Sequence, residues 1–187
     1  MKYCSDCGSE VEYKIPGDDN RHRHVCLGCK TIHYQNPKIV AGCIPEQAGK
    51  ILLCKRAIEP QYGKWTLPAG FMENDESTTQ AALRETLEEA NATVVIHDLY
   101  TVINLTHVNQ VYLIYRAALT EQGFSPGAES LEVELYGEEE IPWDELAFPV
   151  MRETLRLYFD DIRTGSYTIR TGEIIRNDSG YEFTLHT

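Results

Sequence analysis

The chain has 187 residues and a formal net charge of −12 at pH 7, with 25% charged and 42% hydrophobic residues. This length suffices for one sizeable hydrophobic core and a small appendage, and the composition is ordinary for a globular protein. The acidic balance argues against a general binder of nucleic acid or of membrane surfaces. No apolar run approaches the roughly 20 residues of a membrane helix, and the N-terminus lacks the apolar region of a secretory signal. A cytoplasmic location is therefore expected, with neither a nucleic-acid nor a membrane partner.

Four of the six cysteines form two closely spaced pairs. Cys4 and Cys7 enclose two residues, Cys26 and Cys29 enclose two more, and 18 residues separate the pairs. This spacing is typical of a zinc ribbon, in which four thiolates complete a closed, structural Zn²⁺ site. Disulfides would instead need an oxidising compartment, for which the sequence gives no sign. Residues 1–35 are predicted to form the ribbon, with replacement of one cysteine ligand by a histidine as the alternative, at His22, His24 or His33.

Apolar stretches of strand-like pattern follow Asn36-Pro37 and predict a second domain, residues 36–165. Strands are expected at 38–44 and 50–55 around a turn at 46–49, and, beyond a loop at 63–70 and one central helix, at 93–96, 99–105, 111–119 and 131–136. A loop at 122–128, a turn at 143–146, a helix at 150–163 and a terminal hairpin within 166–187 complete the chain. Cys43 and Cys54 fall in apolar strands and are expected to be buried free thiols.

The central helix carries the clearest local signals. Ser77 and Gln80 form a capping box, which predicts a helix that begins at about Thr78. Asn91 is a plausible end, because asparagine tolerates the left-handed conformation better than most residues.

Three glutamates, Glu85, Glu88 and Glu89, are neighbours on this helix. Like charges three or four positions apart repel by roughly 0.2–0.5 kcal/mol per pair, and Arg84 offers relief within the cluster only to Glu88. A divalent cation would turn this repulsion into a site, because hard cations such as Mg²⁺ prefer oxygen ligands and share their shell with waters and substrate phosphates. The alternative is an ordinary solvated acidic face.

Residues 70–92 resemble the Nudix box, G-x5-E-x7-R-E-U-x-E-E-x-G-U, in which U is a bulky apolar residue. The glycine and all charged positions match, at Gly70, Glu76, Arg84-Glu85 and Glu88-Glu89. Two departures, Thr86 for an apolar residue and Asn91 for glycine, remove no charge. The resemblance implies a metal-dependent hydrolase that splits a diphosphate linked to a nucleoside or similar group, built as an α/β/α sandwich around a mixed sheet.

The resemblance also implies a ligand set for Mg²⁺ or Mn²⁺. Glu85, Glu88 and Glu89 would supply side-chain ligands, and a main-chain carbonyl near Ala69 or Gly70 would join them.

For other residues the resemblance leaves more than one role open. Glu76 would be another ligand or would steady the others, and Arg84 would orient the carboxylates, unless it forms only a surface ion pair with Glu88. The general base need not lie inside the box, and two glutamates on the later loop, Glu129 and Glu132, are candidates for it; the alternative is that they are ordinary solvated charges.

Four segments outside the box, 54–60, 63–71, 126–132 and 140–148, resemble zinc-ribbon Nudix enzymes that include the plant chloroplast FAD diphosphatase. This implies cleavage of FAD to FMN and AMP, or of ADP-ribose to AMP and ribose 5-phosphate, and related ADP-ribose hydrolases imply a homodimer. Four aromatic residues are candidates for stacking on a base and are otherwise core residues: Tyr62, Trp65, Phe71 and Tyr112.

Two other functions remain as alternatives. One is an NADH diphosphatase, although residues 93–125 contain nothing like the S-Q-P-W-P-F-P segment of that group. The other is a nucleotide-sensing regulator with a zinc ribbon, which would be favoured by a degraded box or a basic ribbon. Neither feature is present.

Overall fold

The computed structural model describes residues 1–178 and 180–186, which divide into two compact units between Pro37 and Lys38. The first unit is a small antiparallel sheet of order β1-β2-β3, with bounds β1 (Val11–Lys14), β2 (Arg23–Cys26) and β3 (Ile32–His33). Gly8 and Lys30, which follow the two cysteine pairs, both adopt left-handed backbone angles, with φ of 73° and 65°. The chain therefore turns sharply directly after each pair.

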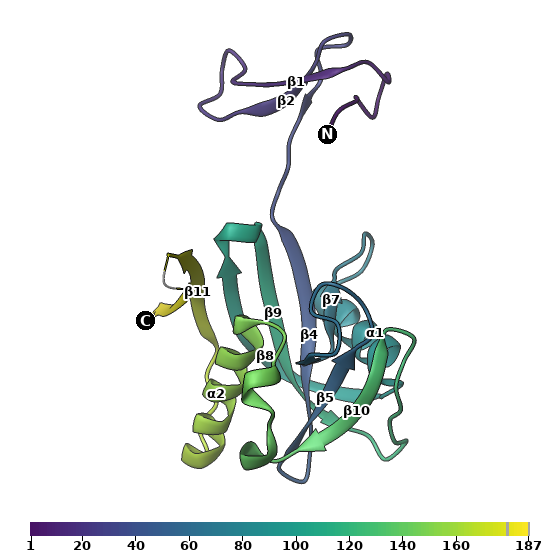
Figure 1. The fold of residues 1–187 in the computed structure, drawn as a ribbon, viewed down its shortest axis with the longest axis vertical. Coiled ribbons are helices and arrows are strands. Elements are labelled where there is room, and N and C mark those ends of the chain that lie inside the picture. Colours follow the sequence, from purple (N-terminus) through teal and green to yellow (C-terminus); the bar gives the residue numbers. More distant parts are fainter. Residues whose placement is uncertain (179, 187) are drawn as a thin grey trace. The chain divides into compact units, whose positions relative to one another are not determined.

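The second unit is built on one mixed sheet (Figure 1). Its described strands run in the order β10-β5-β4-β9-β8-β11-β12, with β6 paired to β5 and β7 paired to β4. β4 pairs with β9 in parallel, as β8 does with β11, and the other pairings are antiparallel. The bounds are β4 (Lys38–Gln47), β5 (Lys50–Arg56), β6 (Trp65–Thr66), β7 (Ala69–Phe71), β8 (Val94–Leu105), β9 (Gln110–Leu119), β10 (Ser130–Tyr136), β11 (Arg170–Asn177) and β12 (Gly180–His186).

Two helices, α1 (Thr78–Ala90) and α2 (Pro149–Thr164), cover opposite faces of this sheet (Figure 1). The alternation of side chains along β4 shows the division. Ala41 and Cys43 pack in one apolar cluster with residues of α1, whereas Val40 and Ile44 pack in another with residues of α2. The predicted α/β/α arrangement is confirmed. Short 3₁₀ helices, η1 (Thr106–Val108), η2 (Glu138–Glu140) and η3 (Trp143–Glu145), link the larger elements.

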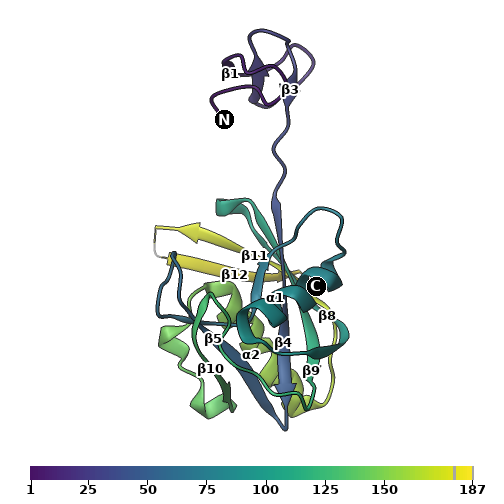
Figure 2. The ribbon, with the colours of Figure 1, turned by 90° about the vertical axis from the view of Figure 1, so that its right-hand side faces the viewer.

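The C-terminal strands form the predicted hairpin, and β11 extends the sheet beyond β8 (Figure 2). A buried carboxylate ties this addition to the core. Asp161 on α2 accepts a 2.9 Å hydrogen bond from the hydroxyl of Tyr100 on β8 and a 2.5 Å charged one from the guanidinium of Arg170 on β11. One side chain thus connects α2 and the nearby β11 to β8, which is distant in sequence from both.

Three details differ from the sequence-based expectation. Residues 93–96 and 99–105 belong mostly to one strand, β8, whose register shifts between Ile96 and Asp98 and between Leu99 and Thr101. Such bulges break the period-two pattern, so one long strand reads as two. The expected loop at 63–70 contains the short strands β6 and β7, and the first turn is tighter than predicted, with Ala48 and Gly49 both at positive φ.

No helix in the described part of the chain combines the length and apolar character needed to cross a membrane. Cys43 and Cys54 are buried and free, as expected from their strands, and burial raises the pKa of the Cys43 thiol to about 11.

Candidate active site and cysteine cluster

The predicted caps set the ends of α1 and therefore the placement of its glutamates. The Ser77 hydroxyl accepts a 3.2 Å hydrogen bond from the Gln80 backbone N–H, and the Gln80 side chain accepts a 2.7 Å bond from the Ser77 N–H. Asn91 ends the helix in the left-handed conformation, with φ of 45°. The buried Thr86 hydroxyl donates to the Ala82 carbonyl at 2.8 Å, so the polar residue at an apolar box position has its partner within the helix.

A cleft of about 910 Å³ lies over one side of α1. It is lined by parts of α1 and by Asn91 directly after it, by β7 and the two residues that follow it, by parts of β4, β5 and β9, by the segments 58–60 and 126–129, and by Phe148. The cleft brings together most of the residues that the sequence singled out, namely Ala69, Gly70, Arg84, Glu85, Glu88, Glu89 and Glu129. Glu76 does not line it but contacts Arg84, and Glu132 is paired with Lys55 at 2.7 Å.

Arg84 organises the carboxylates through all of its guanidinium nitrogens. It makes two hydrogen bonds to Glu76, at 2.7 and 3.1 Å, and single ones to Glu85 at 2.7 Å and to Glu88 at 3.0 Å. A further N–H donates to the Phe71 carbonyl at 3.1 Å. The arrangement is much more than the surface ion pair considered above, and it places Glu76 behind the arginine, where the charge of its carboxylate is offset.

The negative charges of Glu85 and Glu89 are offset less completely than that of Glu76. The two residues are 9% and 8% exposed, and the only hydrogen bond to the Glu89 carboxylate that the described residues show comes from the Ala69 N–H at 3.3 Å. Burial, reinforced by the charge of Glu85, raises the pKa of Glu89 to about 8, and burial also raises the pKa of Glu85. This concentration of buried carboxylate oxygens fits a hard divalent cation, which would supply the missing positive charge.

Gly70 gives Glu85 its position. A Cβ on this residue would lie 2.4 Å from both carboxylate oxygens of Glu85, well inside contact distance. Only glycine therefore lets the carboxylate sit against the backbone of β7.

Replacing Gly70 by alanine should displace the Glu85 carboxylate and lower turnover by about 10- to 100-fold, because a shift of about 1 Å in a reacting group can cost that much. The melting temperature should change little, since the clash is with the end of a side chain. Steady-state kinetics and thermal melts would measure both. Gly17→Ala is the matched control, because a Cβ there meets nothing within 4 Å. Unchanged turnover in Gly70→Ala would contradict the assignment.

Arg56 is a cleft residue that the sequence analysis did not single out. It lies at the end of β5, donates to the Pro60 carbonyl at 2.9 Å, and stands 5.2 Å over the ring of Phe148. Its positive charge opposes the rise in the pKa of Glu89. The sequence did contain a sign of this residue. Lys55 and Arg56 are adjacent at the end of a predicted strand, and because successive side chains point to opposite faces of a sheet, one of the two had to face the side of the helix glutamates.

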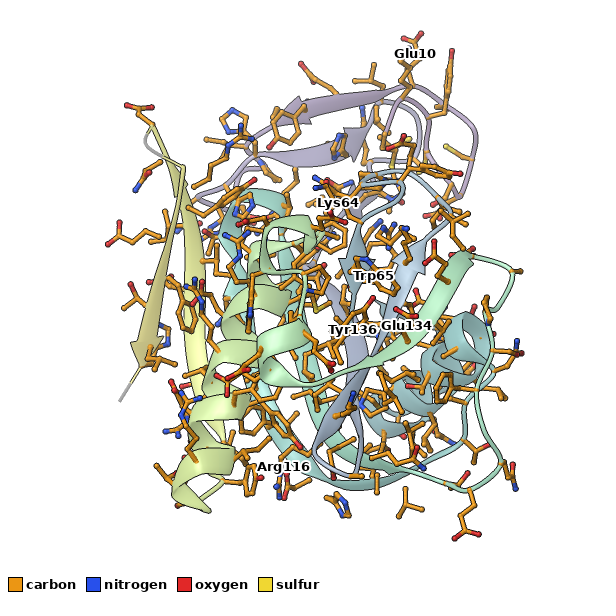
Figure 3. All side chains as sticks on the ribbon, turned by 60° about the horizontal axis from the view of Figure 1, so that its bottom comes forward. Glu10, Lys64, Trp65, Arg116, Glu134 and Tyr136 are labelled. Atoms are coloured by element: carbon orange, nitrogen blue, oxygen red, sulfur yellow. The ribbon has the colours of Figure 1, made fainter. Side chains whose placement is uncertain are left out.

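The four aromatic candidates separate into two groups. Phe71 and Tyr112 line the cleft, and Phe71 is 47% exposed. Trp65 is buried in the core, where it packs edge-on against Tyr136 with ring centroids 5.1 Å apart (Figure 3). Tyr62 is exposed and does not line the cleft. Two of the four therefore have a ring within reach of a bound base.

In the first unit, the four paired cysteines converge. Their sulfur atoms all lie within 4.8 Å of one another, with 3.7 Å between Cys4 and Cys29 and 3.4 Å between Cys7 and Cys26. Tetrahedral zinc with Zn–S distances of about 2.3 Å requires sulfurs about 3.8 Å apart, whereas a disulfide requires about 2.05 Å. The cluster fits zinc and not disulfides.

The surroundings of this cysteine cluster also suit metal-bound thiolates. The Asp6 and Cys29 N–H groups donate to the sulfurs of Cys4 and Cys26 at 3.4 and 3.3 Å. Hydrogen bonds from Ser9 lower the pKa of Cys7 to about 6, whereas burial raises the pKa of Cys4 to about 11 in the absence of a metal charge. His33 places its Nε2 3.2 Å from the Cys4 sulfur, so it lies beside the four sulfurs and replaces none of them.

Comparison with known families agrees with this geometry. Residues 2–35 match the zinc-ribbon family described as Nudix N-terminal, and residues 36–158 match the NUDIX domain. The crystal structure of a NUDIX hydrolase from Nitrosomonas europaea is 55% identical, with a TM-score of 0.90 over 93% of this chain and 99% of that one. The chain belongs to the Nudix hydrolase family, with a zinc-ribbon domain before the Nudix domain.

Two further similarities are narrower. An ADP-ribose pyrophosphatase of Methanocaldococcus jannaschii is 41% identical over 56 residues, which are 30% of this chain and only a third (33%) of that relative. An ADP-ribose pyrophosphatase of Streptococcus suis shares the fold, with 21% identity and a TM-score of 0.61 over 73% of this chain and 99% of that one.

Proposed function

We propose that this protein hydrolyses the diphosphate of an ADP-containing nucleotide, FAD or ADP-ribose, with Mg²⁺ or Mn²⁺. The observation that carries the proposal is the convergence of Glu85, Glu88 and Glu89 with β7 in one cleft, where Arg84 and Arg56 offset only part of their negative charge. Carboxylates left in excess beside an open cleft suit a cation that also binds phosphate oxygens.

In this proposal Glu85, Glu88 and Glu89 hold the metal together with a main-chain carbonyl of Ala69 or Gly70. The bound ion supplies neutralisation of the diphosphate charge and a lowered pKa for a coordinated water. Arg84 and Glu76 do not bind the metal themselves in this proposal. The Arg84 guanidinium, which Glu76 holds, orients the carboxylates that do. Arg56 also lines the cleft, and its charge suits a substrate phosphate.

Glu129 is proposed as the general base. Two observations support this role: Glu129 lines the same cleft as Glu85 and Glu89, and its negative charge contributes to raising the pKa of both. Glu129 would take a proton from the attacking water as the new oxygen–phosphorus bond forms. The bond from that phosphorus to the bridging oxygen breaks, and the leaving phosphate group keeps its electron pair. Glu132, engaged with Lys55, is the less suitable of the two candidates.

Turnover of FAD, ADP-ribose and NADH should be compared with Mg²⁺ present and the products separated by chromatography. We expect AMP release from FAD or ADP-ribose in preference to NADH, because the segments outside the box resemble the FAD diphosphatase group. Turnover of NADH alone would assign the chain to the NADH diphosphatases. No turnover of any of them, with Mg²⁺ bound and the fold intact, would favour the nucleotide-sensing regulator.

The ribbon is proposed to hold one structural Zn²⁺ through Cys4, Cys7, Cys26 and Cys29, as their sulfur separations suit. A homodimer is proposed by resemblance to related ADP-ribose hydrolases, and the hairpin of β11 and β12 offers a sheet edge for it. A monomer in light scattering at micromolar concentration would remove the dimer.

A further inference from the structure

The loop of residues 125–129 is docked on the C-terminal end of α1. The Ser125 N–H donates to the Ala90 carbonyl at 2.9 Å, and the Gly127 N–H donates to the Glu89 carbonyl at 3.0 Å. A Cβ on Gly127 would lie 1.7 Å from the carbonyl oxygen of Glu88, so only glycine permits this contact. The loop backbone therefore rests directly on the residues that carry the helix glutamates.

Asn91 bridges the helix and this loop with its side chain. Its Nδ2 atom lies 3.3 Å from the Ser125 carbonyl, 3.2 Å from the Ser125 hydroxyl and 3.0 Å from the Pro126 carbonyl, and it donates to all three. The Nudix box has glycine at this position, which would supply the left-handed backbone but no side chain. Asparagine supplies both, with φ of 45°.

The far end of the loop carries Glu129. The Ser130 N–H donates to the Gly127 carbonyl at 3.1 Å, and the Glu129 carbonyl accepts from the Ala57 N–H at 2.8 Å. The backbone of Glu129 is thus held between the loop and the segment after β5. Its side chain lines the cleft with Glu85, Glu88 and Glu89.

We infer that Asn91 is a positioning residue, whose side-chain amide holds the 125–129 loop on α1 so that the Glu129 carboxylate faces the helix glutamates. The inference rests on the proposed function, in which Glu129 is the general base. A general base must lie within hydrogen-bond reach of the water it deprotonates, so a loop that shifts by about 1 Å loses much of its effect. The left-handed backbone of Asn91 thus replaces the box glycine, and its side chain adds the contacts to the loop.

Asn91→Gly tests the inference, because glycine keeps the left-handed backbone and removes only the amide. Asn91→Asp keeps the size of the side chain but cannot donate to the two carbonyls. Both variants should speed hydrogen exchange at the amides of Ser125 and Gly127 and lower kcat by about 10- to 100-fold, with KM changed by less than about 2-fold. Asn109→Gly is the matched control, since Asn109 is also left-handed, with φ of 53°, and does not line the cleft.

A double-mutant cycle with Glu129→Gln separates positioning from general stability. If Asn91 acts through Glu129, Asn91→Gly should have almost no further effect on kcat in the Glu129→Gln background. The same fold loss in both backgrounds, or full activity and unchanged exchange in Asn91→Gly, would overturn the inference. The exchange measurement needs no substrate. Failure of every diphosphate substrate would therefore defeat the proposed function, while the loop amides would still show whether Asn91 holds the loop.

Discussion

Replacing Glu89 by glutamine should lower turnover by at least about 100-fold, because even residues that only orient metal ligands contribute about 10- to 100-fold. Glutamine has nearly the same shape, and its carbonyl oxygen can still accept the hydrogen bond from the Ala69 N–H. The variant removes a buried negative charge and one proposed ligand. Kinetics with FAD and ADP-ribose, together with titration of Mg²⁺ or Mn²⁺, would measure the loss.

Although Glu89→Gln should lose activity, it should not lose thermal stability. The pKa of Glu89 is raised to about 8 in the folded protein, so the ionised group opposes folding above the ordinary pKa near 4.5, increasingly up to about pH 8. Without metal, the variant should therefore melt at the same temperature as the original protein or higher at pH 7. Glu139→Gln is the control, because Glu139 is exposed and outside the cleft. Unchanged turnover in a folded Glu89→Gln protein would contradict the assignment of Glu89 as a metal ligand.

Replacing Cys26 by serine should abolish tight zinc binding and unfold the first unit. Within the described residues, the buried apolar side chains of this unit are only Cys4, Val25 and Cys26. Such a small core cannot stabilise a sheet, and structural zinc typically contributes about 10–16 kcal/mol of apparent binding free energy. Zinc content after gel filtration and the dispersion of amide resonances from residues 1–37 would report both effects.

The control for the cysteine variant is Cys43→Ser. Cys43 is equally buried, but it lies in the second unit and is not one of the four clustered cysteines. Its zinc content should equal that of the original protein. Full zinc retention in Cys26→Ser, with an ordered first unit, would show that the four sulfurs are not the ligand set.

Much of the candidate site follows from short-range sequence patterns. The capping box at Ser77 and Gln80 and the left-handed Asn91 set the ends of α1, and a helical period then places Glu85 and Glu89 one turn apart. The turns after the cysteine pairs are similarly local. These features involve residues fewer than about five positions apart, whose geometry the backbone fixes almost alone.

Other parts of the site depend on residues that only folding brings together. Arg84 meets Glu76 eight positions away by reaching back across the turn before the helix, so the Glu76 carboxylate lies behind the arginine instead of in the cleft. Arg56 enters from β5, and the 125–129 loop returns across the end of α1 to deliver Glu129. No periodic pattern in the sequence predicts these long-range contacts.

The sequence by itself determined the two kinds of site, a cluster of four thiolates and a helix crowded with carboxylates, because ligand chemistry and helical spacing are properties of neighbouring residues. Only the tertiary structure decided which carboxylates are buried and which have their negative charge offset by an arginine. It also decided that Asn91 holds a loop, that Trp65 belongs to the core, and that β11 joins the sheet in parallel beside β8. Burial and long-range pairing arise from the packing of the whole chain, and they set the electrostatics of the cleft.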